Sequence, residues 1–273
     1  MNELVSIIIP TYNRGNIIRD SIESVLNQTY GNIEIIVVDD CGTDNTKEVV
    51  ESINDGRIKY IRLEKNKGAG GARNEGVKFA EGQLIAFHDS DDICMEDRIE
   101  RQMEYLSEHP EFDLVYSSYI KVQDNIEYVI PVNCDKVELE GDIYRKLLVR
   151  NTVGCPTILL KKDGFNDIGG FDETYSCLED WDFIIRYSKK HLIGFIDTPL
   201  ILSKYSQDGL SADSINHFKT RSRMIASYKE ELERMDLFKH VVMTYFASAE
   251  KTGWLDFAKS CLMQELVNTA NIN

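Results

Sequence analysis

The chain has little positive charge for its size. Its 31 lysine and arginine residues are outnumbered by 46 aspartate and glutamate residues, which gives a formal net charge of −15. Binding to nucleic acid needs clustered cationic side chains that displace counterions from phosphates. The charge balance therefore argues against a DNA or RNA partner.

Paired cysteines and long apolar runs are also missing. The six cysteines are scattered without a CxxC pair or the spacing of a zinc site, which favours reduced thiols in a cytoplasmic protein. The acidic start lacks the basic and long apolar regions of a signal peptide. No apolar run approaches the ~20 residues that cross a bilayer, so we expect membrane contact to be peripheral, at the inner face.

The first half of the chain alternates short apolar runs with amphipathic patterns. Four runs have the length of buried strands: Val5 to Ile9, Ile33 to Val38, Ile58 to Leu63 and Leu84 to Phe87. Between and after them, apolar residues recur at helical spacing in 18–26, 49–53 and 99–106. Alternating strands and helices predict an α/β fold, with a mostly parallel, Rossmann-like sheet covered by helices on both sides.

The second half has a mixed pattern and ends in helices. Residues 114–119, 128–132 and 157–161 read as strands, and residues 143–149 read as a helix. After Asp213 the apolar residues Met224, Tyr228, Leu232 and Met235 follow helical spacing. We expect a catalytic domain over 1–212, with halves 1–112 and 113–212, and a C-terminal helical region over 213–273.

Polar clusters follow three of the predicted strands. Thr11 to Arg14 follows the first strand, Asp39 and Asp40 end the second, and His88 to Asp92 follows the fourth. In sheets of this kind, ligands bind outside the carboxyl ends of the strands. The three clusters are therefore expected to meet at one edge of the sheet.

The acidic cluster Asp89-Ser90-Asp91-Asp92 is a candidate metal site. Mg²⁺ or Mn²⁺ is typically held by one or two carboxylates together with substrate phosphates. The alternative is that Asp91 or Asp92 caps a helix that begins near Met95. A DxD pattern alone is a weak signal, so its neighbours decide its meaning.

A glycine-rich stretch from Lys67 to Asn74 opens a predicted helix. Backbone N–H groups and positive charge at a helix start suit a diphosphate. The order of residues is neither that of a P-loop nor a GxGxxG after the first strand. A surface turn without a ligand is the alternative.

These motifs, taken in order, resemble the family 2 glycosyltransferases of GT-A fold. The resemblance covers about residues 4 to 205 and rests on six segments: 10–14, 37–40, 68–74, 87–92, 169–173 and 179–182. It implies that 1–112 is a nucleotide-binding half and 113–212 an acceptor-side half. It also implies an inverting transfer of a hexosyl or N-acetylhexosaminyl group from a nucleotide diphosphate sugar, with Mn²⁺ or Mg²⁺ as cofactor.

The resemblance also assigns roles to single residues. Asp180 is the expected general base, Asp91 the metal ligand, and Asp39 the acceptor of a hydrogen bond from uracil N3–H. Asp182, two residues after the base, is expected to face elsewhere on the helix, and Asp40 is expected to be a turn residue. The expected nucleotide-binding residues are Pro10, Thr11, Tyr12, Asn13, Arg14, Asp39, Gly68, Arg73, Asp89 and Ser90.

The chain departs from the family in two places. His88 stands where an apolar residue usually precedes the acidic cluster, and a lone histidine there is more often packed than a metal ligand. Many relatives carry Arg or His near the diphosphate in the segment that corresponds to 205–211, and this sequence has neither there.

The donor base and the acceptor are less specified. UDP is favoured over dTDP and GDP by the family, and the acceptor is expected to be a surface polysaccharide, a lipid-linked glycan or a glycoprotein. The helices of 213–273 are expected to help receive the acceptor or to form a homodimer contact. A sugar-nucleotide pyrophosphorylase, a non-catalytic nucleotide-sugar binding protein and a signalling receiver domain are the alternatives.

Overall fold

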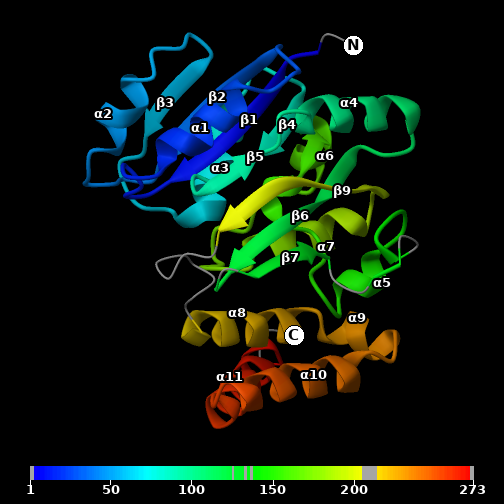
Figure 1. Cartoon of the computed structure of the whole chain (residues 1–273). Coiled ribbons are helices and arrows are strands. Elements are labelled where there is room, and N and C mark those ends of the chain that lie inside the picture. Colours follow the sequence, from blue (N-terminus) through cyan, green and yellow to red (C-terminus); the bar gives the residue numbers. More distant parts are fainter. Residues whose placement is uncertain (1–2, 125, 132–133, 136–137, 205–213, 271–273) are drawn as a thin grey trace.

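The computed structural model describes residues 3–124, 126–131, 134–135, 138–204 and 214–270. These residues form one mixed sheet with helices on both faces and a group of helices at the C-terminal end (Figure 1). The strands are β1 (Val5–Thr11), β2 (Ile33–Asp39), β3 (Ile58–Arg62), β4 (Leu84–Phe87), β5 (Asp92–Cys94), β6 (Leu114–Gln123), β7 (Ile126–Ile130), β8 (Leu159–Lys161) and β9 (Ile193–Lys204).

The strand order places the carboxyl ends of the first strands together. The order is β3-β2-β1-β4-β8-β6-β9-β5, and β7 pairs with β6. Strands β1 to β4 are mutually parallel, whereas β8 runs antiparallel to β4 and β6. The strand order runs from β1 through β2 to β3 on one side and continues with β4 on the other side of β1, and ligands bind in the crevice at such a reversal of strand order. The predicted α/β fold is confirmed.

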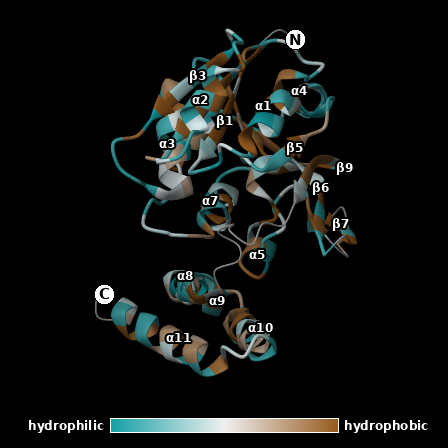
Figure 2. Ribbon diagram, turned by 60° about the vertical axis from the view of Figure 1, so that its left-hand side comes forward, coloured by the Kyte–Doolittle hydropathy of each residue, from teal (hydrophilic) through white to brown (hydrophobic). Residues whose placement is uncertain are grey.

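Helices cover both faces of the sheet (Figure 2). They are α1 (Ile18–Leu26), α2 (Thr46–Glu51), α3 (Gly68–Phe79), α4 (Arg98–Glu108), α5 (Tyr144–Leu147), α6 (Lys162–Asp167), α7 (Glu179–Ser188), α8 (Ser214–Ser227), α9 (Lys229–Arg234), α10 (Phe238–Lys251) and α11 (Leu255–Ala270). No helix in the described part of the chain is long and apolar enough to span a membrane.

Two hydrophobic clusters lie on opposite faces of the sheet. Successive side chains of a strand point to opposite faces, so Ile7 and Ile9 pack in one cluster and Ile8 in the other. The first cluster is completed by α1, α2 and α4. The second includes side chains of α3, α5 and α7 and continues into α8 to α11. The C-terminal helices therefore share a core with the sheet.

The second half differs in detail from its sequence pattern. The run 157–161 begins as a 3₁₀ turn at Cys155–Thr157, because Pro156 favours a turn start, and only Leu159–Lys161 is a strand. Strands β5 and β9 were not predicted. β5 is three residues long, and β9 contains Pro199 at a register irregularity opposite Ser118.

The expected continuous helical pattern after Asp213 is divided. Helix α8 ends at Ser227, and Tyr228 is the residue before α9. Met224 and Leu232 are each 1% exposed and pack into the shared core. The helical spacing of these residues was therefore read correctly, while the break between the two helices at Tyr228 was missed.

Candidate active site

A cavity of about 940 Å³ lies at the carboxyl ends of the first strands. It is lined by residues that follow β1, β2 and β4, by the start of α3 and by the turn before α7. Every residue that the sequence predicted for the site lines this cavity, except Asp39. The structure thus brings together the three strand-end clusters and the Glu179-Asp180 pair, which is far away in sequence.

The segment after β1 forms one wall of the cavity. Asn13 has a left-handed backbone (φ 53°), and its side-chain oxygen accepts a hydrogen bond from Thr43 N at 2.7 Å. Asparagine tolerates this conformation better than most residues. The following Arg14 lies 3.9 Å from Asp91 through its Nη2. Tyr12 is 49% exposed, so its ring is available to a ligand.

Asp39 and Asp40 have different positions from those that the sequence suggested. Asp39 is 3% exposed, accepts hydrogen bonds from Gly42 N at 2.7 Å and from the Tyr60 hydroxyl, and does not line the cavity. Asp40 does line it, and accepts hydrogen bonds from the N–H groups of Lys67 and Gly68 at 2.7 and 2.8 Å. Asp40 is therefore the carboxylate of this pair that faces the cavity, and it also fixes the start of α3.

The glycine-rich start of α3 is shaped by a turn. Gly68 has a φ of +75°, a conformation that glycine adopts without the strain of a side chain. The N–H groups of Lys67 and Gly68 point at Asp40, so these two donors are already used. The stretch is a structured turn on the cavity wall, and it is hydrogen-bonded to Asp40, directly after β2.

Arg73 joins three parts of the site. Its guanidinium donates to Asp89 Oδ1 and to Glu179 Oε1, both at 2.7 Å, and the residue is 4% exposed. Buried cations are stable only when they are paired and hydrogen-bonded. Arg73 therefore holds α3, the loop after β4 and the start of α7 in a fixed arrangement.

The acidic cluster lies in the short connection between β4, which ends at Phe87, and β5. Asp92 begins β5, and the Ser203 side chain hydrogen-bonds to it. The next helix, α4, begins at Arg98, so the expectation that Asp91 or Asp92 caps a helix near Met95 is wrong. Burial, followed by the charge of Asp89, raises the pKa of Asp91.

The cluster suits a divalent cation that also binds phosphate. The described residues contain no group of three or more His, Cys, Asp or Glu side chains arranged as a preformed metal cage. Mg²⁺ needs no such cage, because one or two carboxylates and substrate phosphate oxygens suffice. Asp91 and Asp89 line the cavity side by side, and burial followed by the charge of Asp89 raises the pKa of Asp91. Carboxylate oxygens are ligands for hard cations, so the donor set fits Mg²⁺ or Mn²⁺.

His88 is buried behind this cluster. It has no exposed surface, and burial, together with the charge of Arg98, lowers its pKa to about 3. The ring is therefore neutral at physiological pH. It is packed in the interior, as the sequence suggested for a lone histidine at this position.

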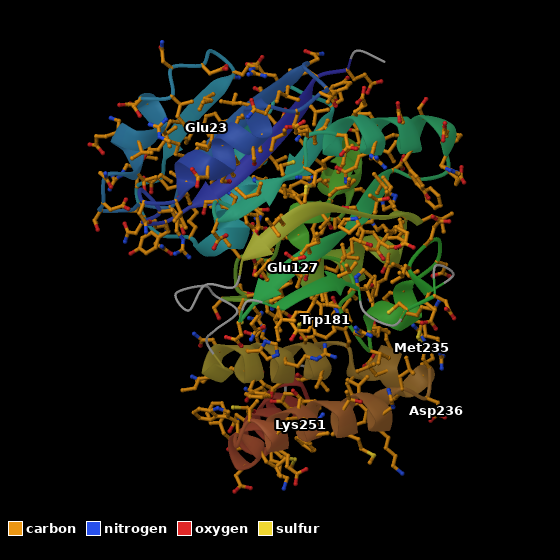
Figure 3. All side chains as sticks on the ribbon, in the orientation of Figure 1. Glu23, Glu127, Trp181, Met235, Asp236 and Lys251 are labelled. Carbon is orange, nitrogen blue, oxygen red and sulfur yellow. The ribbon has the colours of Figure 1, made fainter. Side chains whose placement is uncertain are left out.

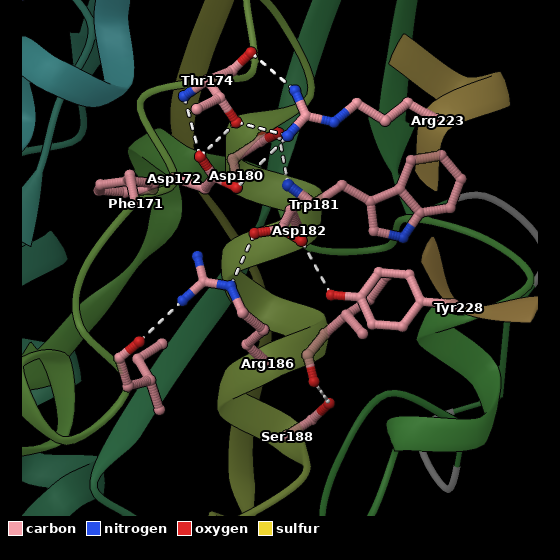
Figure 4. A network of polar contacts seen from close by, with 12 residues as sticks. Phe171, Asp172, Thr174, Asp180, Trp181, Asp182, Arg186, Ser188, Arg223 and Tyr228 are labelled. Atoms are coloured by element: carbon pink, nitrogen blue, oxygen red, sulfur yellow. Dashed lines mark hydrogen bonds and ion pairs between the residues drawn. The ribbon is translucent and has the colours of Figure 1, made fainter. Parts of the chain in front are cut away.

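The first turn of α7 carries Asp180, which lines the cavity. Burial, followed by the negative charge of Glu179, raises the pKa of Asp180 to about 7. A carboxyl group with this pKa exchanges protons readily near neutral pH. Asp182 does not line the cavity; its oxygens bind Arg186 Nε at 2.7 Å and the Tyr228 hydroxyl at 2.8 Å (Figure 4).

Sequence reasoning missed the far wall of the cavity. Lys121 of β6 and Ser203 of β9 are register partners, and Ser203 also pairs with Asp92, so the three side chains share one face. His217 of α8 lines the cavity as well. Only the strand pairing and the placement of α8 reveal these residues, and no local motif marks them. The segment 205–211, where relatives carry Arg or His, lies outside the described residues.

Comparisons with known proteins agree with this geometry. The family model described as "Glycosyl transferase family 2" matches residues 6–163. WfgD of Escherichia coli, a UDP-Glc:alpha-D-GlcNAc-diphosphoundecaprenol beta-1,3-glucosyltransferase, is 35% identical over 232 residues, which cover 83% of this chain and 87% of WfgD. WfaP of Escherichia coli, named for the same activity, is 39% identical over 167 residues, covering 61% of this chain and 64% of WfaP.

Solved structures show the same fold. TarS of S. aureus in complex with UDP has a TM-score of 0.69 at 24% identity, covering 92% of this chain and 74% of the TarS chain. The mannosyltransferase PcManGT of Pyrobaculum calidifontis, in complex with GDP-Man and Mn²⁺, has a TM-score of 0.67 at 16% identity, covering 100% of this chain and 79% of PcManGT. With the family match and the relatives, the conclusion is plain: the chain belongs to glycosyl transferase family 2 and is a glycosyltransferase.

Proposed function

We propose that the protein transfers a sugar from a UDP-sugar to a hydroxyl group of a lipid-linked, GlcNAc-type glycan. The observation that carries the proposal is the position of Asp180. Its carboxylate lines the same cavity as the nucleotide-side wall and Asp91, and its pKa is raised to about 7. The names of WfgD and WfaP support UDP-glucose as donor and a diphospholipid-linked GlcNAc as acceptor.

The proposed reaction is a single displacement with inversion. The Asp180 carboxylate accepts the proton of the acceptor hydroxyl. At the same time, the hydroxyl oxygen attacks the anomeric carbon of the donor sugar. The bond between that carbon and the diphosphate oxygen breaks, and UDP leaves. One carboxylate is sufficient, because no covalent intermediate forms with the protein.

The residues on the nucleotide side bind and orient the donor. Tyr12 offers an exposed ring to the base, and Asp40 offers the carboxylate that faces the cavity. In place of the expected Asp39, Asp40 is proposed as the acceptor of the uracil N3–H. Arg73 holds the loop after β4 and the start of α7 in place through ion pairs with Asp89 and Glu179.

A divalent cation is proposed at Asp91. When bound, Mn²⁺ or Mg²⁺ neutralises part of the charge of the diphosphate. Asp89 lies beside it, with one oxygen bound to Arg73 at 2.7 Å. Because the proposed acceptor is carried by a lipid, the enzyme is expected to work at a membrane surface by peripheral contact.

The test uses UDP-glucose and a short-chain lipid that carries α-linked GlcNAc diphosphate. Mass spectrometry is expected to show a lipid-linked disaccharide with wild-type protein and Mn²⁺, and Asp180→Asn is the inactive control. Pyrophosphate release from UTP and glucose 1-phosphate would identify a pyrophosphorylase instead. UDP binding with neither hydrolysis nor transfer of any UDP-sugar would identify a binding protein.

A further inference from the structure

The first turn of α7, which carries Asp180, follows a residue with a strained backbone. The residue before it, Leu178, has a left-handed backbone with a φ of 59°, and no side chain caps the helix there. A non-glycine residue in this region is strained. Within the turn, Asp180 Oδ1 accepts a hydrogen bond from Trp181 N at 2.7 Å, so the orientation of this carboxylate depends on the position of Trp181. Contacts that fix Trp181 therefore bear on Asp180.

Trp181, directly after the base, provides the attachment point. Its side chain is largely buried, and its indole Nε1 donates a hydrogen bond to Leu147 O at 2.7 Å. In Figure 3 its label lies between the sheet and the C-terminal helices. Trp181 thus faces α8 while its neighbour Asp180 faces the cavity.

Arg221 of α8 covers the other side of the indole. Its guanidinium carbon lies 3.7 Å from the ring centroid, a close cation–π distance. Its Nη2 lies 3.4 Å from Leu148 O and 3.3 Å from Val149 O, just after α5. Burial lowers the pKa of Arg221 to about 9, so the side chain stays protonated at neutral pH.

A second contact joins the same two parts of the molecule. The hydroxyl of Tyr228, just after α8, donates to Asp182 Oδ1 at 2.8 Å (Figure 4). Arg223 of α8 donates to Thr174 O at 3.0 Å and to Thr174 Oγ1 at 2.6 Å, in the loop before α7. Helix α8 and Tyr228 therefore contact the chain both before Asp180, at Thr174, and after it, at Trp181 and Asp182.

We propose that Arg221 is a positioning residue, which acts through Trp181 to orient the Asp180 carboxylate toward the acceptor hydroxyl. The C-terminal helical region is then part of the catalytic apparatus. This inference rests on the proposed function, in which Asp180 is the base. Arg221 does not line the cavity, so it acts on Asp180 only through Trp181.

The positioning role of Arg221 can be measured as the ratio of two rates, the transfer of the donor sugar to the acceptor and the hydrolysis of the donor by water. Water is small and reaches the anomeric carbon from several directions, whereas the acceptor hydroxyl needs an aligned base. A displaced Asp180 therefore lowers transfer more than hydrolysis. Both rates come from the same active molecules, so their ratio does not depend on the fraction of protein that is folded.

Arg221→Met keeps the bulk of the side chain and removes its charge. With UDP-glucose and the GlcNAc-diphosphate lipid, we expect the ratio of transfer to hydrolysis to fall roughly 10- to 100-fold, the scale of a misplaced catalytic group. The KM for UDP-glucose is expected to stay within about 2-fold. Arg221→Lys should recover part of the ratio. Lys219→Met, an exposed position on the same helix, is the matched control and should leave the ratio unchanged.

Hydrogen–deuterium exchange supplies a readout without substrate. Peptides that cover 176–182 are expected to exchange faster in Arg221→Met and in Trp181→Phe than in wild type, and to be unchanged in Lys219→Met. An unchanged ratio with a lowered melting temperature, or unchanged exchange in 176–182, would show that Arg221 only anchors α8 and would overturn the inference. Wild-type protein that neither transfers nor hydrolyses UDP-glucose would instead count against the proposed function, and the exchange result would still decide the positioning step.

Discussion

Arg73 and Glu179 form a buried ion pair in which Nη1 lies 2.7 Å from Oε1, with side chains 5% and 8% exposed. The pair connects the glycine-rich start of α3 to the turn that carries Asp180. Glu179 therefore has two effects on its neighbour. It fixes the position of the turn, and its negative charge is the second cause, after burial, of the raised pKa of Asp180.

Glu179→Gln should shift the pH dependence of the reaction. In wild type the base must be deprotonated, so kcat/KM is expected to rise with pH up to about 7 and then level off. Without the charge of Glu179, the pKa of Asp180 falls, and the rise should occur at lower pH. The pH profile of kcat/KM measures this, with exposed Glu173→Gln as the control. A rise at the same pH in both variants would contradict the role of Glu179.

Asp180→Asn should lose activity and gain stability. General-base assistance contributes roughly 10²- to 10⁴-fold, so transfer should fall by about that factor. The folded pKa of about 7 lies above the ordinary value of 3.8, so ionising Asp180 destabilises the fold as pH rises between these values. At pH 8 the variant should be more stable by on the order of 1 to 3 kcal/mol, and the difference should vanish near pH 4.

Thermal unfolding at both pH values checks the stability change, and Asp182→Asn is the matched control. That carboxylate is 4% exposed and binds Arg186 and Tyr228. The change should lower the melting temperature, because charge-assisted hydrogen bonds are lost. Normal transfer by Asp180→Asn, with a folded and inactive Asp182→Asn, would reverse the two assignments.

The parallel half of the fold could be predicted because most of its strands are short apolar runs. In β2 and β4, for example, every residue is buried, so the pattern stands out without an alignment. β5 could not be recognised, because its three residues begin with Asp92 of the acidic cluster. β9 was missed because Asp197 and Pro199 interrupt its apolar pattern.

Site residues were predicted where polar side chains directly follow a strand in the sequence. They were missed where elements far apart in the sequence come together. Lys121, Ser203 and His217 reach the cavity only through strand pairing and helix packing. The choice between Asp39 and Asp40 depends on which way each side chain points at the end of β2. Adjacent carboxylates have the same chemistry, so the sequence could not decide it.

Asp39→Asn and Asp40→Asn are expected to have different effects. Asp39 accepts hydrogen bonds from Gly42 N and Tyr60 inside the protein, so its change should lower the melting temperature with little effect on UDP affinity. Asp40 faces the cavity, so its change should weaken UDP binding by on the order of 10-fold, the scale of one charged hydrogen bond. Calorimetric titration with UDP and thermal unfolding separate the two. Lost UDP binding in an otherwise stable Asp39→Asn protein would restore Asp39 as the base contact.

UDP binding is expected to require a divalent cation. The diphosphate brings negative charge beside Asp91, whose pKa is already raised by burial and by Asp89. Arg14 lies 3.9 Å from Asp91 through Nη2, and the charges of Arg14 and Arg73 offset the raised pKa of Asp91 only in part. Two like charges at close range repel each other by several kcal/mol at low effective dielectric, unless a cation lies between them. In wild type, replacing Mn²⁺ by EDTA should therefore weaken UDP by roughly 10-fold or more.

Asp91→Asn tests whether Asp91 holds that cation. The variant has one negative charge fewer, so UDP should bind it in EDTA at least as well as it binds wild type in EDTA, while added Mn²⁺ should improve binding little. Asp97→Asn, exposed and paired with Arg101 at the start of α4, should keep the full metal dependence. Titration calorimetry with UDP in Mn²⁺ and in EDTA gives all six affinities. Equal wild-type affinity in both conditions, or a strong Mn²⁺ effect that persists in Asp91→Asn, would show that the charge of the diphosphate is balanced elsewhere.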